Sequence, residues 1–155
     1  MPLNRSQIAA LIPHAGAMCL LERVAAWDDS SIRSVAVSHA DAGNPLRCAG
    51  RLPVLCGIEY AAQAMALHGA LSGVAGARPR SGYLASLRDV ACGRERLDDL
   101  PGELEIEAVR LMGDDSRVIY QFTLQAGEAL VLSGRATVVL NADSLEAAVA
   151  GAVSK

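Results

Sequence analysis

The stretch from Arg51 to Ala77 reads RLPVLCGIEYAAQAMALHGALSGVAGA, and it decides how the rest of the chain must be arranged. Its composition predicts a helix over about 55–74 that is apolar on every side. Such a helix must be covered by the remainder of the fold. Glu59 nevertheless stands in its first turn, where a buried carboxylate is costly unless it is paired, hydrogen-bonded or used. The sequence therefore indicates a central helix with a candidate functional group at its start.

Composition and charge exclude several classes of protein. The 155 residues are 52% apolar and 20% charged, with a net charge of -3, which is typical of a single globular domain with a sizeable core. Arginines are scattered and aromatic residues are few, so no nucleic-acid surface is expected. The four cysteines form no CxxC pair. We therefore expect reduced thiols in a cytoplasmic protein, and no metal site.

The length of the apolar stretch raises the question of a membrane span. Residues 54–77 are nearly long enough to cross a bilayer. However, Glu59, Gln63 and His68 interrupt the stretch, and one central charge costs about 2.5–3.5 kcal/mol on insertion scales. The N-terminal apolar run at 8–12 is too short for an export signal. We expect a buried helix and no membrane span.

Shorter apolar segments with strand-like alternation surround the helix. Before it, the pattern predicts a short helix capped by Ser6 through Ile12, strands at 18–27 and 32–37, and a loop over 40–53. After it, strands are predicted at 83–90, 103–112, 118–124 and 129–140. The last of these is apolar on both faces, so we expect it to lie inside a sheet.

This order predicts an α+β protein with the hotdog architecture, a curved antiparallel sheet of about six strands wrapped around one long buried helix. No repeat or linker is visible, so residues 1–155 are expected to form a single domain. Its core is expected over about 8–140, with an Ala-rich tail over 141–155 that resembles a helix at the edge. Such sheets pair edge to edge, which removes an exposed edge strand and makes a dimer the expected state.

Four motifs carry a resemblance to a known family. They are Ile12-Pro13-His14, the apolar run 18–24 that ends in Glu-Arg-Val, Pro53 followed by Glu59-Tyr60-Ala61-Ala62-Gln63, and Leu100-Pro101-Gly102-Glu103. Over roughly residues 8–140 the chain resembles the β-hydroxyacyl-acyl-carrier-protein dehydratases of the hotdog superfamily. It is more closely similar to the dehydratase-like proteins of aryl-polyene-type biosynthetic clusters. The resemblance implies acyl thioester substrates on an acyl carrier protein or coenzyme A, and no cofactor.

One departure separates the chain from the dehydratases. They carry a catalytic histidine, followed by Phe-Pro-Gly, in the loop before the helix. The corresponding position is Pro45 when counted back from Glu59, and Arg47 when counted forward from the second strand. Residues 44–47 contain no histidine, and in this respect the chain resembles the dehydratase-like subfamily.

The chemistry implied by the resemblance has three requirements. Loss of water from a 3-hydroxyacyl thioester needs a base for the Cα proton, an acid for the leaving hydroxyl, and donors for the thioester oxygen. If burial keeps Glu59 protonated, it can serve as the acid; if the helix dipole keeps it ionised, it can activate water for hydrolysis. We expect the donors to be backbone amides near Cys56 and Gly57, where glycine also permits close approach.

The base is the open question. His14 is the preferred candidate because it resembles the family's Pro-His motif, with a role in pinning its loop as the alternative. His39 lies at the end of a strand and is expected at the surface. His68 is nine residues after Glu59, or two and a half helical turns, so it faces away and is expected to pack in the helix.

Two amide side chains are predicted to bind substrate. Gln63 lies one turn after Glu59 on the same helix face, where it can orient Glu59 or contact substrate. A plain structural hydrogen bond is the equal alternative. Asn44 is a candidate contact for the thioester or hydroxyl group, with a turn role beside Pro45 as its alternative.

The sequence thus predicts a 3-hydroxyacyl-ACP dehydratase-like protein of fatty-acid or polyene biosynthesis, a hydro-lyase with Glu59 and His14 as catalytic residues. Gly57, Gln63 and Asn44 are the predicted substrate-binding residues. Two alternatives remain open: an acyl-thioester hydrolase on the same fold, and a non-catalytic subunit paired with an active dehydratase. The expected partners are the carrier of the acyl group and a second hotdog subunit, identical or related.

Overall fold

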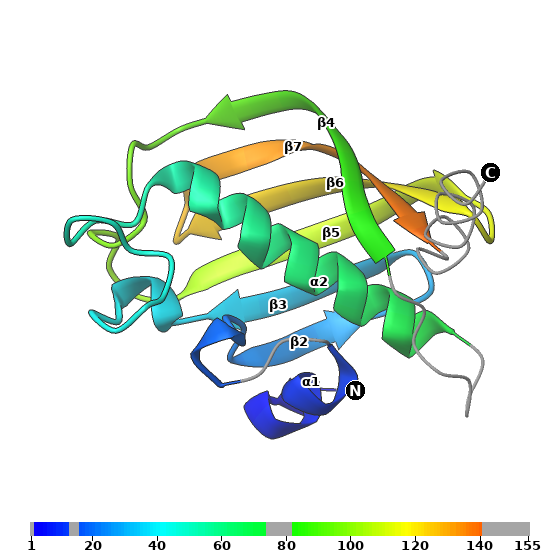
Figure 1. The fold of residues 1–155 in the computed structure, drawn as a ribbon, viewed down its shortest axis with the longest axis horizontal. Helices are drawn as coiled ribbons and strands as arrows, with labels where there is room; N and C mark the ends of the chain where they lie inside the picture. Colours follow the sequence, from blue (N-terminus) through cyan, green and yellow to red (C-terminus); the bar gives the residue numbers. More distant parts are fainter. Residues whose placement is uncertain (1, 13–15, 74–81, 141–155) are drawn as a thin grey trace, which may run out of the picture.

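A computed structural model describes residues 2–12, 16–73 and 82–140 (Figure 1). The helices are α1 (Arg5–Leu11) and α2 (Gly57–Ser72), with 3-10 turns η1 (Gly16–Met18), η2 (Ser38–Ala40) and η3 (Val54–Cys56). The strands are β1 (Leu3–Asn4), β2 (Arg23–Trp27), β3 (Ser31–Ala36), β4 (Gly82–Cys92), β5 (Leu104–Gly113), β6 (Arg117–Ala126) and β7 (Ala129–Leu140). The Ala-rich tail predicted over 141–155 lies outside the described residues.

Seven strands form one antiparallel sheet in the order β1-β2-β3-β5-β6-β7-β4. β7 lies between β6 and β4, which confirms the interior position predicted from its two apolar faces. About six strands were expected. The additional one is β1, a two-residue strand that pairs with β2 at Leu3 and Val24 and is too short to show any alternation.

Helix α2 crosses the sheet diagonally and packs mainly against β3, β5 and β6 (Figure 1). This arrangement confirms the hotdog architecture. The 3-10 turn at Val54–Cys56 leads directly into α2, so helical backbone begins just after Pro53. Among the described residues, no helix combines the length and the apolar character that crossing a membrane requires.

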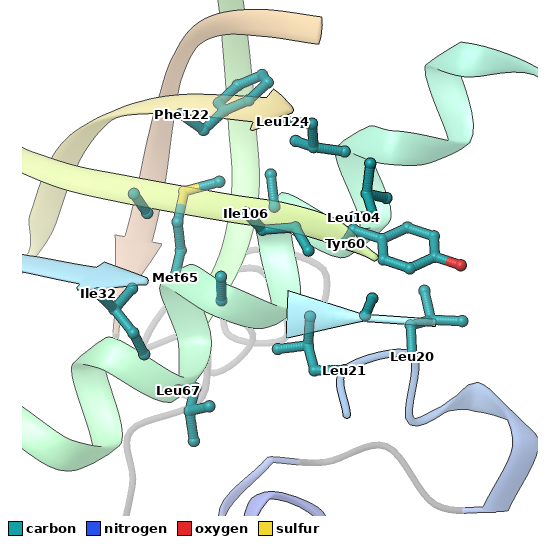
Figure 2. Packing of buried hydrophobic residues seen from close by; sticks show 14 of the residues in the cluster. Leu20, Leu21, Ile32, Tyr60, Met65, Leu67, Leu104, Ile106, Phe122 and Leu124 are labelled. Atoms are coloured by element: carbon teal, nitrogen blue, oxygen red, sulfur yellow. The ribbon is translucent and has the colours of Figure 1, made fainter. Parts of the chain in front are cut away.

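The core forms where strand alternation meets the helix. On β5, Leu104, Ile106 and Ala108 are fully buried, whereas the residues between them are partly exposed. Figure 2 shows Leu104 and Ile106 together with Phe122 and Leu124 of β6, beside Met65 of α2. Period-two patterning therefore places one face of each strand against the helix, as the sequence predicts.

The expectation that α2 is covered on every side is wrong for one stripe. Ala66 and Gly69 are exposed, and Ile58 and Ala62 are only partly buried. The reason is geometric, because a helix that lies on a single sheet buries one side and leaves the opposite side to solvent. In the single chain this stripe of small and apolar residues faces outward.

The N-terminal region differs from the prediction in two places. The cap of α1 is Asn4, not Ser6: the Asn4 side chain accepts from the Gln7 amide at 3.0 Å, and the Gln7 side chain accepts from the Asn4 amide at 2.9 Å. The strand expected at 18–27 is confined to Arg23–Trp27. The backbone of Leu20 bonds to side chains instead of to a neighbouring strand.

β4 forms an edge of the sheet, since among the described strands it pairs only with β7. Its register shifts twice, between Leu84 and Ser86 and between Arg88 and Ala91. Arg88 stands directly opposite Arg135 of β7, and both side chains are exposed. The large apolar side chains exposed near this edge are Tyr83, Val90 and Leu130.

A buried polar cluster holds the far end of α2. His68 Nε2 lies 2.8 Å from the Asp28 carbonyl oxygen, and Nδ1 lies 2.7 Å from the Tyr120 hydroxyl. Because a carbonyl only accepts, Nε2 carries the proton of the neutral ring and Nδ1 accepts from Tyr120. Burial lowers the pKa of His68 and raises the pKa of Tyr120 to about 12. The expectation that His68 packs within the fold is consistent with this position.

Glycine at position 57 is required for close packing, and the helix contains a matched control. A Cβ atom at Gly57 would lie 2.8 Å from methyl carbons of both Leu124 and Leu132, whereas one at Gly69 would meet nothing within 4 Å. We expect Gly57→Ala to lower the free energy of unfolding by about 1–3 kcal/mol through overpacking. Gly69→Ala should raise it by about 0.5–1 kcal/mol. Urea denaturation at one protein concentration measures both, and equal effects would contradict the packing requirement.

Buried neutral histidines make stability depend on pH. Burial lowers the pKa of both His39 and His68, so below the ordinary value of 6.5 the unfolded chain takes up protons that the folded chain resists. Stability should therefore be complete above pH 6.5 and fall on acidification, by at most about 1.4 kcal/mol per pH unit for each histidine. Urea unfolding at pH 7.5, 6.5 and 5.5 tests this, and His68→Gln should show a smaller slope. A free energy of unfolding that does not change over this pH range would contradict the prediction.

Candidate active site

Glu59 lies in the first turn of α2 and is partly buried. The chain reaches this point from Pro53 through the 3-10 turn, so the carboxylate stands near the positive end of the helix dipole. Gln63 follows one turn later on the same face. The candidate site therefore lies at the first two turns of α2.

The backbone amides expected to be free donors are already used. The Cys56 amide donates to the Pro53 carbonyl at 3.0 Å, and the Gly57 amide contacts the carbonyl oxygens of Val54 and Leu55. The expectation that these two amides are free is wrong, because the 3-10 turn at Val54–Cys56 precedes α2 and its hydrogen bonds use both of them. Gly57 approaches the leucines of β6 and β7 closely, and a substrate contact by Gly57 stays a prediction.

Gln63 is fully buried, and its amide group is committed to the main chain. Its Oε1 accepts from the Leu20 amide at 3.0 Å, and its Nε2 donates to the Met18 carbonyl at 2.7 Å. These bonds agree with the structural alternative considered for this residue. A substrate contact by Gln63 stays a prediction, since it would have to share atoms that already have partners.

Asn44 is likewise tied to its surroundings. Its Nδ2 donates to the Ser38 carbonyl at 2.9 Å and to the Tyr60 hydroxyl at 3.0 Å, and its Oδ1 accepts from the Leu46 amide at 2.9 Å. The bond to Leu46 is the turn role beside Pro45 that the sequence suggested. A contact between Asn44 and the substrate stays a prediction.

Tyr60 and Ser38 are polar residues of this region that the sequence prediction did not include. The Tyr60 hydroxyl lies 2.9 Å from Ser38 Oγ, which in turn donates to the Leu20 carbonyl at 2.7 Å. In Figure 2 the Tyr60 ring lies at one end of the cluster and its hydroxyl points outward. Burial raises the pKa of Tyr60, so the group is a neutral hydroxyl at physiological pH. A loop serine and asparagine that precede a tyrosine within an apolar helix are too weak a signal to identify this cluster in advance.

The loop that carries a histidine in the dehydratases is held by other residues here. Arg47 donates to the His39 carbonyl at 3.4 Å and to the Gly50 carbonyl at 3.2 Å. His39 was expected at the surface but is fully buried, because its ring lies against the backbone of Leu100 and Gly102. Neither ring nitrogen of His39 makes a hydrogen bond within the described residues.

The other predicted groups divide between described and undescribed parts of the chain. His14 lies outside the described residues, so its role as base stays a prediction. Burial raises the pKa of the Cys56 thiol, which keeps it protonated and poorly nucleophilic. His68 lies two and a half turns beyond Glu59 and is committed to Asp28 and Tyr120, so it is not available to Glu59.

The arrangement is suited to acid–base chemistry. A partly buried carboxylate at a helix start can donate or accept a proton, and the helix dipole acts on its charge. The side chains of Asn44, Tyr60 and Gln63, on the loop before α2 and in its first two turns, are uncharged and fixed by hydrogen bonds. Fixed groups of this kind suit a reaction that requires precise orientation.

Solved structures share this fold. The dehydratase heterocomplex ApeI:P from Xenorhabdus doucetiae matches with a TM-score of 0.72 and 20% sequence identity, over 86% of this chain and 90% of that chain. Thioesterase HI1161 from Haemophilus influenzae matches with a TM-score of 0.63 and 15% identity, over 89% and 90%. A mutant of thioesterase PA1618 from Pseudomonas aeruginosa matches with a TM-score of 0.64 and 13% identity, over 89% and 94%.

Sequence comparison identifies the family. No curated protein sequence matches the chain. The sequence pattern of the ApeP-like family, described as ApeP dehydratase, matches residues 6–149 and so spans nearly the whole chain. This extent agrees with the resemblance carried by the motifs from Ile12 to Glu103. The chain therefore belongs to the ApeP-like family of dehydratases.

Proposed function

We propose that this chain eliminates water from 3-hydroxyacyl thioesters and that Glu59 is the acid. The observation that supports this best is the position of Glu59, a partly buried carboxylate in the first turn of α2. The family assignment supports the reaction class. Fold neighbours alone do not separate dehydration from hydrolysis, because they include proteins of both kinds.

In the proposed reaction a base removes the Cα proton and Glu59 protonates the departing β-hydroxyl group. The C–O bond breaks as the Cα–Cβ double bond forms, and the products are an enoyl thioester and water. We assign the base to His14, on the strength of the Pro-His motif. The substrate is proposed to be carried by an acyl carrier protein, with coenzyme A as the other carrier, in the cytoplasm.

We further propose that the chain works as a dimer with a related hotdog subunit. The exposed apolar residues beside the unpaired edge of β4 support a second sheet at this edge, and the outward stripe on α2 adds uncovered surface. The Xenorhabdus relative is a heterocomplex, which supports a non-identical partner. If the partner alone is active, this chain is the non-catalytic subunit.

A thioesterase is the second candidate. Its water-activating step requires a carboxylate but no loop histidine, which suits the segment 44–47. Two fold neighbours are named thioesterases. In this alternative Glu59 is ionised and acts as a base toward water.

Replacing the carboxylate should separate these possibilities. We expect Glu59→Gln to lower enoyl formation by about 10²–10⁴-fold, because the amide cannot protonate the leaving group. Mass spectrometry of 3-hydroxyacyl and enoyl carrier-protein thioesters measures this, with the protein alone and with a related hotdog subunit. Glu95→Gln, at an exposed glutamate, is the matched control and should retain full activity. Release of free acid would identify a thioesterase, and no Glu59-dependent change would leave the non-catalytic subunit.

The proposed base can be tested against the same reaction. We expect His14→Asn to reduce enoyl formation to a similar extent as Glu59→Gln. Because the two groups act in one transition state, the double variant should be little slower than either single one. Single-turnover rates measure this non-additivity. Wild-type rates in His14→Asn would remove His14 from the mechanism and leave the acid assignment standing.

A further inference from the structure

We propose that Tyr60 and Gln63 are positioning residues, which fasten the main chain at Met18–Leu20 to the face of α2 that carries Glu59. We call these residues, with Ser38, the Leu20 clamp. Their role rests on the function proposed above and concerns how that site is held in place. It differs from the substrate contact predicted for Gln63 and brings in Tyr60 and Ser38.

The first arm of the Leu20 clamp is Gln63. Its fully buried carboxamide accepts from the Leu20 amide and donates to the Met18 carbonyl, at 3.0 and 2.7 Å. The two bonds run in opposite directions, so the orientation of the amide follows from its partners. An ionised carboxylate could make only the first bond. A carboxamide at this position therefore matches both ends of the segment it holds.

The second arm runs from Tyr60 through Ser38, and its direction can be deduced. Ser38 Oγ lies 2.7 Å from the Leu20 carbonyl, which can only accept, so the single hydroxyl proton of Ser38 points to Leu20. Ser38 Oγ must then accept from the Tyr60 hydroxyl at 2.9 Å. Tyr60 in turn accepts from Asn44 Nδ2 at 3.0 Å. One directed chain of hydrogen bonds thus connects the loop to Leu20 through the first turn of α2.

Both polar backbone atoms of Leu20 are consequently held by the clamp. Leu20 is fully buried and lies outside every strand, so these side-chain bonds take the place of a sheet ladder. Gln63 and Glu59 share a helix face, and the backbone held by Gln63 lies on the side from which Glu59 projects. Displacement of this backbone would change the surroundings of Glu59, and small misplacements of reacting groups cost about 10²-fold in rate.

The variants are chosen to remove single atoms. Tyr60→Phe deletes the hydroxyl that donates to Ser38, and Ser38→Ala deletes the hydroxyl that donates to Leu20. Ser38→Thr keeps that hydroxyl and should rescue the loss. Matched controls are Tyr120→Phe, at a buried tyrosine bonded to His68, and Ser34→Ala, at a buried serine whose hydroxyl lies 3.4 Å from the Ile106 carbonyl.

Two measurements are made on each variant. Hydrogen exchange of the Leu20 amide should become at least tenfold faster in Tyr60→Phe and Ser38→Ala, and should stay near the wild-type rate in Ser38→Thr and both controls. The kcat for water elimination should fall at least tenfold in the same two variants, with KM within about twofold, because misplaced reacting groups slow the chemical step more than they weaken substrate binding. A merely structural role would not change kcat selectively.

Each contrary result has a distinct meaning. Unchanged exchange at Leu20 overturns the clamp itself. Faster exchange with kcat no lower than in Tyr120→Phe and Ser34→Ala overturns the positioning role. Hydrogen exchange can be measured without catalytic turnover, so it tests the clamp independently of the proposed function. If the wild-type protein eliminates no water, the proposed function is overturned. Any effect of the clamp on catalysis is then overturned as well, whatever the exchange rates are.

Discussion

The constraint on which this structure depends is that α2 carries polar side chains into an apolar core, where each polar atom needs a partner. Tyr60, Gln63 and His68 are all fully or almost fully buried. Most of their partners belong to segments before the helix in sequence, at residues 18–20, 28, 38 and 44. Polar bonds therefore hold segments of the N-terminal half of the chain to α2, whereas β5 and β6 contact it mainly through apolar packing, with the bond between His68 and Tyr120 of β6 in addition.

The fold could be predicted further than the site. Alternation on β5 and β6 and the apolar character of the central helix are local patterns, and they suffice for the hotdog architecture. The bond between Leu20 and Gln63 joins residues 43 positions apart, and no local pattern reveals it. For the same reason Leu20 was assigned to a strand, although its backbone bonds to side chains. The Gly57 amide is not the free donor that the sequence predicts, because a 3-10 turn stands directly before α2 and its carbonyl groups accept from this amide.

In the loop before α2, the position that holds a histidine in the dehydratases has side chains of different chemistry in this chain. Asn44 and Arg47 occupy the region where the dehydratases carry their histidine, and both bond to nearby backbone. The loop thus keeps a defined shape without a titratable catalytic group. Glu59 stands on the helix itself, in the first turn of α2.

The edge formed by β4 has a consequence for the newly made chain. An open edge usually recruits any extended peptide, because its backbone groups have no partners. Here two register shifts interrupt the strand, and Arg88 beside Arg135 places two like charges next to the edge. A regular strand from an unrelated protein would lose register at each irregularity and meet that charge. These features discourage aggregation with foreign strands and leave the edge suited only to a strand with matching irregularities.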